Sequence, residues 1–74
     1  MQKEHYEEYK KLALNIAYYR KEKGYSQMIL SEKIGISRTH MSRIENNDCS
    51  LSLDVVFKIA KALDIPVYKL FEFR

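Results

Sequence analysis

Polar and cationic side chains gather along one side of a short segment, residues 38–46, that the sequence predicts to be helical. They are Arg38, Thr39, Ser42, Arg43 and Asn46. At about 100° of rotation per residue they fall within an arc of about 140°. On a helix side that faces only water, Glu, Lys and Ala would favour the helical conformation more strongly than these residues do. Guanidinium and hydroxyl groups in this arrangement instead suit hydrogen bonding to the bases and phosphates of a nucleic acid.

The composition indicates one small globular domain covering residues 1–74. Hydrophobic residues make up 46% of the chain and charged residues 31%, an ordinary globular mixture. The core must be near the lower size limit for independent folding. We expect no membrane span and no secretory signal, because no long apolar run occurs and the first residues are polar. The single cysteine, Cys49, indicates a reducing compartment, and we expect a cytoplasmic protein.

The formal net charge of +3 permits nucleic-acid binding without requiring it. Residues 1–24 contribute +2, residues 25–47 contribute +1 and residues 48–74 are neutral. Many small soluble domains are equally basic. Whether the chain binds a nucleic acid therefore has to be judged from the positions of its charged residues and not from its net charge.

The apolar spacing predicts a compact all-α domain of five helices. The first helix should run from about Lys3 or Glu4 to Lys23, with Gly24 as its stop. Further helices are expected over about 27–34, 38–46 and 53–63. Pro66 suits the first turn of a fifth helix in "PVYKLFEF".

Three of these predicted helices begin with the same device. Ser26, Ser37 and Ser52 each stand where an N-cap is expected, with an apolar residue just before and another four positions after. Asn47 can take the left-handed conformation at the end of the 38–46 helix.

The short link "GIS" between residues 34 and 38 predicts a helix-turn-helix over about 26–46. Gly35 can supply a positive φ, and Ile36 can return to the core. The second helix of such a motif lies in the major groove of DNA with its first residues at the base edges. Here those residues are Arg38 and Thr39, and Ser42 and Arg43 follow one turn later. An arginine can donate two hydrogen bonds to guanine, and a threonine offers a methyl group to thymine.

Other polar side chains fit contacts to the DNA backbone. Ser26 and Gln27 stand at the start of a helix, where free N–H groups and the helix dipole favour an anion. Ser37, His40 and Asn46 flank the expected base-contacting side and would touch phosphates.

Two stretches, "YSQMILSEKIGISRTHMSRIENN" and "LSLDVVFKIAKALDIPVYKLF", resemble the phage-repressor type of helix-turn-helix, the XRE-like or Cro/repressor family. The similarity covers about Leu12 to Phe71. It rests on Arg20 before Gly24, Ser26-Gln27, Gly35-Ile36-Ser37, Ile44-Glu45-Asn46, Leu53 and the run from Ile59 to Leu63. The resemblance implies a lambda-repressor-like fold and a transcriptional regulator that binds a palindromic operator in double-stranded DNA as a homodimer.

The resemblance also implies roles for individual residues. Gln27 would contact a phosphate and the adjoining base pair, and Asn46 would hold the DNA backbone. Arg38, Thr39 and Arg43 would contact bases. Arg20 and Glu45 match a family ion pair that ties the first helix to the end of the third.

The sequence also departs from that family's usual pattern. Met28 and Ile29 replace residues that are commonly acidic or small, Asn47 replaces Gly, Leu51 replaces Pro, and Tyr6 and Tyr9 lie on extra N-terminal turns. An exposed Ile29 leaves a second function open, a protein-interaction module such as an antitoxin or a coactivator. Co-purification of an equimolar partner would favour that function.

Apolar residues near the C-terminus predict a surface for a second copy. They are Val67, Leu70, Phe71 and Phe73. So small a domain has too little core to bury them all. Tyr6 and Tyr9 could close the same interface, or the aromatic rings could simply seal the monomer's own core.

No arrangement of residues in the sequence indicates catalysis, a metal or another cofactor. Cys49 is the only thiol, and His5 and His40 are far apart along the chain, so a zinc site has little support. The sequence shows no nucleophile–base arrangement and no phosphate-binding loop. We therefore expect a binding protein and not an enzyme.

Overall fold

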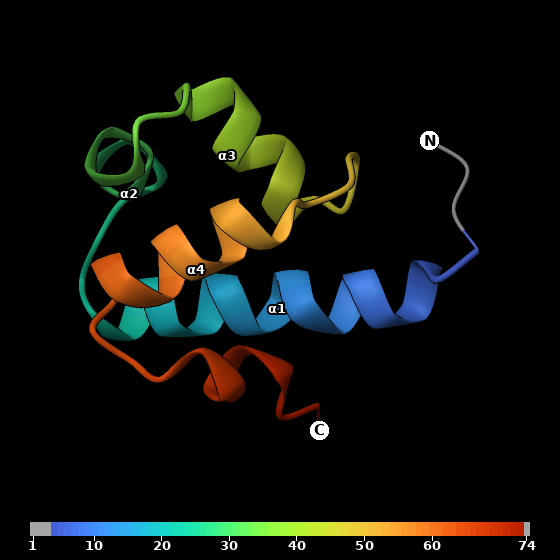
Figure 1. Cartoon of the computed structure of the whole chain (residues 1–74). Coiled ribbons are helices and arrows are strands. Elements are labelled where there is room, and N and C mark those ends of the chain that lie inside the picture. The colour runs from blue at the N-terminus through green and yellow to red at the C-terminus, as the bar shows by residue number, and fades with distance from the viewer. Residues whose placement is uncertain (1–3, 74) are drawn as a thin grey trace.

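The computed structural model describes residues 4–73, which form four α-helices and one short 3-10 helix (Figure 1). The elements are α1 (Tyr6–Glu22), α2 (Gln27–Ile34), α3 (Arg38–Glu45), α4 (Leu53–Ala62) and η1 (Val67–Phe71). The predicted bounds of α2 are confirmed, and those of α3 and α4 end one residue earlier than predicted. α1 begins at Tyr6, later than predicted, and Lys3 lies outside the described residues.

The helices enclose one apolar core, as an all-α domain requires. Its buried members are Leu12, Ile16, Leu30, Ile34, Met41, Ile44, Val56, Ile59, Ala60, Leu63 and Leu70. η1 packs against α1 and α4, and it lies on the side of α1 away from α2 and α3 (Figure 1). Within residues 4–73, none of the helices combines the length and the apolar character needed to cross a bilayer.

The fifth predicted helix is wrong as an α-helix, because residues 67–71 form a 3-10 turn. The amide of Lys69 bonds to the carbonyl of Pro66, three residues back, at 3.0 Å. The carbonyl of Leu70 accepts a hydrogen bond from the Asn15 side chain on α1. That tertiary bond, together with the burial of Leu70, favours the tighter turn over a short isolated α-helix.

The three predicted N-caps are confirmed. The Ser26 and Ser37 hydroxyl oxygens each accept a hydrogen bond of 3.0 Å from the backbone N–H of the residue three positions later. The Ser52 hydroxyl oxygen accepts the same kind of bond at 3.2 Å. Each bond satisfies an N–H group that has no partner within its helix.

Each of the four α-helices is followed, within two residues of its end, by a residue in the left-handed conformation. These residues are Gly24 (φ 82°), Gly35 (φ 78°), Asn47 (φ 60°) and Asp64 (φ 57°). In each case the next residue's N–H bonds five residues back, as from Ile36 to the Ser31 carbonyl at 3.0 Å. The predicted left-handed residues Gly35 and Asn47 are therefore confirmed. Asp64 was not predicted, although Asp tolerates this conformation.

Candidate nucleic-acid interface

The link from α2 to α3 has the sharp turn that the sequence predicts. Gly35 reverses the chain direction with its positive φ, and Ser37 starts the next helix within two residues. Leu30, Met41 and Ile44 lie in the core between the two helices, with exposed fractions of 1% or less. The inner side of α3 is thereby fixed, and its other side must face solvent.

The predicted base-contacting residues lie on that outer side of α3. Arg38, Thr39 and Arg43 are exposed, and Ser42 is half-buried. Among the predicted phosphate contacts on or beside α3, Ser37 and Asn46 are exposed and His40 is half-buried. The structure therefore brings this group together along one short helix. The arc predicted from spacing alone corresponds to the exposed side of α3.

Two side chains near the C-terminal end of α3 make local contacts. Asn46 Nδ2 lies 3.4 Å from Ser42 Oγ, and Arg43 Nη2 lies 3.5 Å from the Asp48 carbonyl oxygen. Both distances are at the long end for a hydrogen bond, so these contacts are weak. An incoming phosphate or base edge can replace them at little cost.

The N-termini of α2 and α3 offer donors of a second kind. Ser26 and Ser37 are exposed at the starts of these helices, and their hydroxyl oxygens accept the capping bonds. A hydroxyl that accepts a bond still has an O–H to donate. The positive end of the helix dipole adds to the attraction for an anion.

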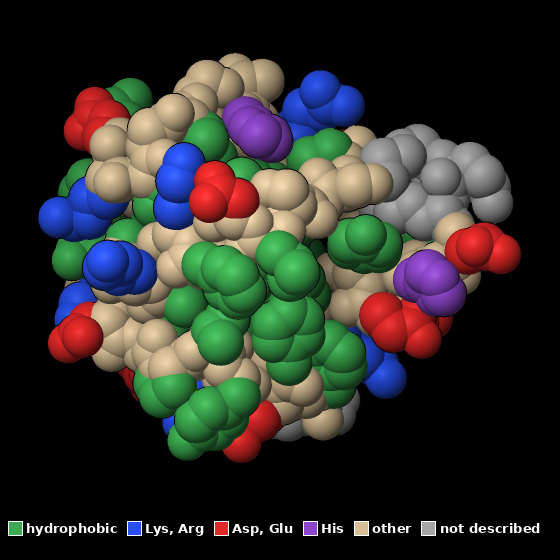
Figure 2. All heavy atoms as spheres, in the orientation of Figure 1, with side chains coloured by type: hydrophobic (Ala, Val, Ile, Leu, Met, Phe, Trp, Pro, Cys, Tyr) green, Lys and Arg blue, Asp and Glu red, His purple; other side chains and the backbone are tan. Residues whose placement is uncertain are grey.

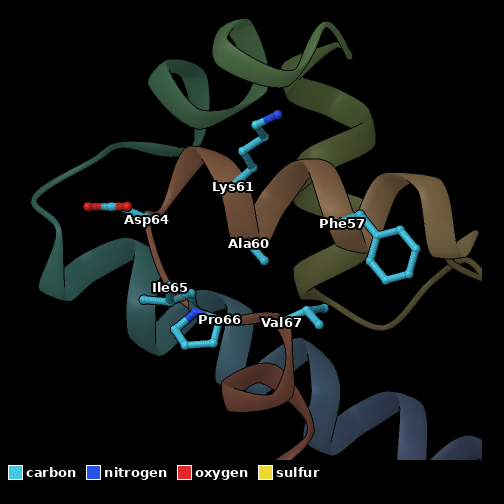
Figure 3. A pocket seen from close by; sticks show the side chains of 7 residues that line it. All are labelled: Phe57, Ala60, Lys61, Asp64, Ile65, Pro66 and Val67. Atoms are coloured by element: carbon cyan, nitrogen blue, oxygen red, sulfur yellow. The ribbon is translucent and has the colours of Figure 1, made fainter.

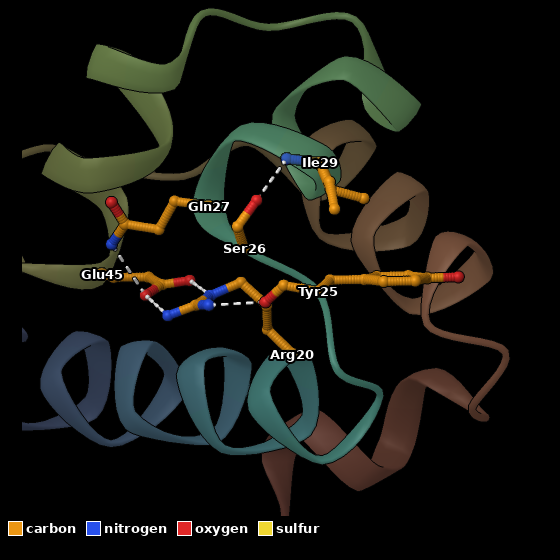
Figure 4. A network of polar contacts seen from close by, with 6 residues as sticks. All are labelled: Arg20, Tyr25, Ser26, Gln27, Ile29 and Glu45. Carbon is orange, nitrogen blue, oxygen red and sulfur yellow. Dashed lines mark hydrogen bonds and ion pairs between the residues drawn. The ribbon is translucent and has the colours of Figure 1, made fainter.

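A buried ion pair fixes the position of the helix-turn-helix relative to α1 (Figure 4). The Arg20 guanidinium donates to both carboxylate oxygens of Glu45, at 2.7 and 3.0 Å, and to the Tyr25 carbonyl at 2.8 Å. Only 9% of the Arg20 side chain and 5% of the Glu45 side chain are exposed. The predicted pair is present, and it joins α1, the start of α2 and the end of α3.

Gln27 belongs to the same network, and the sequence did not predict this bond to Glu45. Its Nε2 donates a hydrogen bond of 3.1 Å to Glu45 (Figure 4). An amide carries two N–H groups, and this bond uses one of them. The predicted phosphate contact of Gln27 stays a prediction. The position of Gln27 after Ser26 does not show which way its side chain points.

An apolar surface covers the side of the molecule formed by α4 and the C-terminal residues (Figure 2). We call it the α4–η1 surface, and its exposed members are Leu53 (63%), Phe57 (52%), Phe71 (43%) and Phe73 (39%). Val67 beside it is half-buried. The predicted C-terminal interface therefore needs a correction, because Leu70 is 0% exposed and packs into the monomer's own core.

The contribution of α4 was also missed. Leu53 and Phe57 are four residues apart and therefore share one side of the helix, next to the side formed by Val56, Ile59 and Ala60. Their spacing was a usable signal that α4 carries apolar residues beyond those needed for the core.

Two hollows lie beside these side chains, one at Phe57 and the other at Leu53. One, of about 490 Å³, lies between α4 and the segment before η1, with Phe57 and Val67 at one end and Asp64 at the other (Figure 3). The other, of about 430 Å³, lies between the start of α1 and the start of α4. Its walls include Tyr9, Leu53, Phe71 and Phe73. Both hollows are open to solvent, so the α4–η1 surface is uneven and not flat.

Met28 and Ile29 are exposed on α2, at 52% and 41%. The departure from the family pattern thus leaves two adjacent apolar side chains in solvent. A protein contact at this place stays a prediction, which isolation of an equimolar complex would test.

Comparison with known proteins places this geometry in a family. The helix-turn-helix family matches residues 16–70. The transcriptional regulator SinR of Bacillus subtilis is 40% identical over 58 residues, which are 77% of this chain and 52% of SinR. A solved SinR–SinI protein complex matches with a TM-score of 0.76 and 37% identity over 82% of this chain and 60% of the other. The chain spans about half the length of the curated relatives it matches.

Two restriction–modification controller proteins share the fold. C.AhdI from Aeromonas hydrophila has a TM-score of 0.87 and 32% identity, covering 93% of this chain and 100% of C.AhdI. The C.Esp1396I tetramer bound to its natural 35-base-pair operator has a TM-score of 0.78 and 33% identity, covering 86% of this chain and 84% of the other. With the family match over residues 16–70 and the observed helix-turn-helix, this chain belongs to the XRE-type helix-turn-helix family.

Proposed function

We propose that this chain is a sequence-specific DNA-binding transcriptional regulator that places α3 in the major groove. The observation that carries the proposal is the exposed side of α3, where Arg38, Thr39 and Arg43 stand on a helix whose inner side is locked into the core. Such a helix presents hydrogen-bonding groups at fixed positions, which base recognition requires.

In this proposal the position of each side chain determines whether it contacts a base or a phosphate. Arg38 and Thr39, on the first turn, contact base edges, and Ser42 and Arg43 contact bases one turn further along. Ser26, Gln27, Ser37, His40 and Asn46 bind phosphates and so set the register of α3. The buried Arg20–Glu45 pair keeps α3 at a fixed angle to α1, so little order has to be gained on binding.

We further propose that two copies bind together as a homodimer with a two-fold axis. One recognition helix touches too few base pairs to select a site in a genome. The α4–η1 surface supplies an apolar contact, and a two-fold axis lets the same surface serve both copies. The two α3 helices would then enter the major groove about 34 Å apart, one turn of DNA.

Replacing Arg38 with alanine tests the role of α3. We expect binding to the preferred duplex to weaken by about 1–3 kcal/mol per half-site, because a bidentate contact to one base is lost in each half-site. Fluorescence anisotropy at fixed salt measures this. Lys11→Ala is the matched control, since Lys11 is an exposed cation on α1 that lines a hollow with Leu14, Asn15 and Tyr18. Equal losses in the two variants would mean that only net charge matters.

Replacing Phe57 with serine tests the α4–η1 surface. Phe57 is 52% exposed in the monomer, so we expect the fold to survive and the dimer to dissociate into folded monomers. Analytical ultracentrifugation together with circular dichroism shows both properties. Leu14→Ser is the control, because Leu14 is 59% exposed on α1 and does not belong to this surface. A wild-type protein that stays monomeric at tens of micromolar would rule out the proposed homodimer.

A further inference from the structure

Asn15 is an unusual residue to find inside so small a core. It lies in the middle of α1 with only 6% of its surface exposed, next to the fully buried Ile16. A buried amide is unfavourable unless hydrogen bonds replace its lost water. Neither the proposed DNA contacts nor the Arg20–Glu45 network uses this side chain.

The amide of Asn15 binds the C-terminal segment at two points. Its Nδ2 donates to the Leu70 carbonyl at 2.9 Å and to the Glu72 carbonyl at 3.2 Å. The Leu70 carbonyl belongs to the peptide group that leads into Phe71, and the Glu72 carbonyl to the group that leads into Phe73. One side chain therefore holds both peptide groups that immediately precede the two exposed phenylalanines.

The segment held in this way has weak local structure. η1 is a 3-10 turn of five residues, and its last hydrogen bond, from the Glu72 amide to the Lys69 carbonyl, is 3.4 Å long. Such turns have poorer hydrogen-bond geometry than an α-helix. Leu70 fixes the segment to the core, but one buried side chain does not set the rotation of the residues after it. The Asn15 bonds supply that second constraint.

The direction of the two rings matters because they form part of the α4–η1 surface. The Phe71 and Phe73 ring centroids lie 6.3 Å apart at an interplanar angle of 52°. Both rings line the hollow of about 430 Å³ beside Leu53 and Tyr9. A self-complementary interface contains each apolar group twice, once from each copy. A change in the direction of the rings therefore disturbs the interface at two places.

We propose that Asn15 is a positioning residue for the pairing of two copies, which it serves by fixing the backbone before Phe71 and Phe73. The inference rests on the homodimer proposed above. The occupant of the α4–η1 surface is a second copy of this chain. Asn15 itself lies on α1 and acts through the C-terminal segment.

Asn15→Leu tests this role, because leucine has a similar size and no N–H to donate. We expect the variant to keep its helical circular dichroism signal, and its dimer dissociation constant to rise by at least about tenfold, since two aromatic anchors lose their fixed direction. Leu14→Ala, a change at the exposed neighbour on α1, should leave the dissociation constant unchanged. Asn15→Ser, which keeps one donor, should give an intermediate value. If the leucine variant does not fold, the dissociation constant of Asn15→Ser is compared with that of the wild type instead.

Joining two copies through a flexible Gly/Ser linker separates positioning from a general effect on the fold. Linkage replaces weak pairing with a high effective concentration, so linked Asn15→Leu copies should bind a two-fold-symmetric duplex within about threefold of linked wild type. A folded Asn15 variant that dimerises as tightly as wild type would overturn the inference and leave the homodimer intact. A wild type that never dimerises would instead remove the homodimer itself. Loss of the fold in both Asn15 variants would assign the amide to the core and also overturn the inference.

Discussion

Replacing Glu45 with glutamine is expected to lower the free energy of unfolding by about 3–5 kcal/mol, because it leaves the Arg20 guanidinium buried without a counter-charge. Only 9% of the Arg20 side chain is exposed, so water cannot take the place of the carboxylate. The Gln27 amide loses a charged acceptor in the same step. For a domain of 74 residues this corresponds to a fall in the melting temperature of at least about 12 °C.

Glu22→Gln provides the matched control for that measurement. Glu22 is exposed at the end of α1, and its contact with the Tyr18 hydroxyl is 3.4 Å long. Its loss should change the stability by no more than about 0.5 kcal/mol. Urea unfolding followed by circular dichroism compares the two variants. Equal, small effects would show that the Arg20–Glu45 pair contributes little to the fold.

The starts of α2, α3 and α4 and the ends of α2 and α3 were predictable because a few neighbouring residues encode them. Ser26, Ser37 and Ser52 each cap a helix through a bond to a residue three positions later. Gly35 and Asn47 end α2 and α3 through their own backbone conformation. None of these features needs a distant part of the chain.

The C-terminal segment was predicted less well because distant residues determine its structure. Asn15 is 55 residues away from Leu70, and its hydrogen bond favours the 3-10 turn. The same packing buries Leu70, which the sequence assigned to a dimer interface. Apolar spacing shows that residues 67, 70, 71 and 73 are hydrophobic, but it does not show which of them the monomer's own core takes up.

The candidate site shows the same division between local and distant information. The exposed side of α3 follows from helical spacing, since burial of Met41 and Ile44 fixes the opposite side. The bond from Gln27 to Glu45 spans 18 residues and depends on how α2 packs on α3. Sequence alone therefore predicted which helix carries the polar face, and missed one member of the network behind it.

DNA affinity should fall steeply with salt, and this is the largest effect that we expect. If two copies together neutralise about six to ten phosphates, a plot of log affinity against log salt concentration has a slope near −5 to −9. Raising the salt from 50 to 200 mM then weakens binding by roughly 10³ to 10⁵. Anisotropy titrations of one labelled duplex at four or five salt concentrations give the slope. A slope near zero would be incompatible with a protein that binds the DNA backbone.

Selection of bound duplexes from random DNA, done in parallel with wild type and Arg38→Ala, tests most directly whether α3 recognises bases. For the wild type the proposal predicts a site with two-fold symmetry and half-sites about one helical turn apart, or a multiple of that spacing. For Arg38→Ala it predicts the same site with relaxed preference at one position in each half-site. An unenriched wild-type pool, or a site that is identical for the two proteins, would contradict the role given to α3.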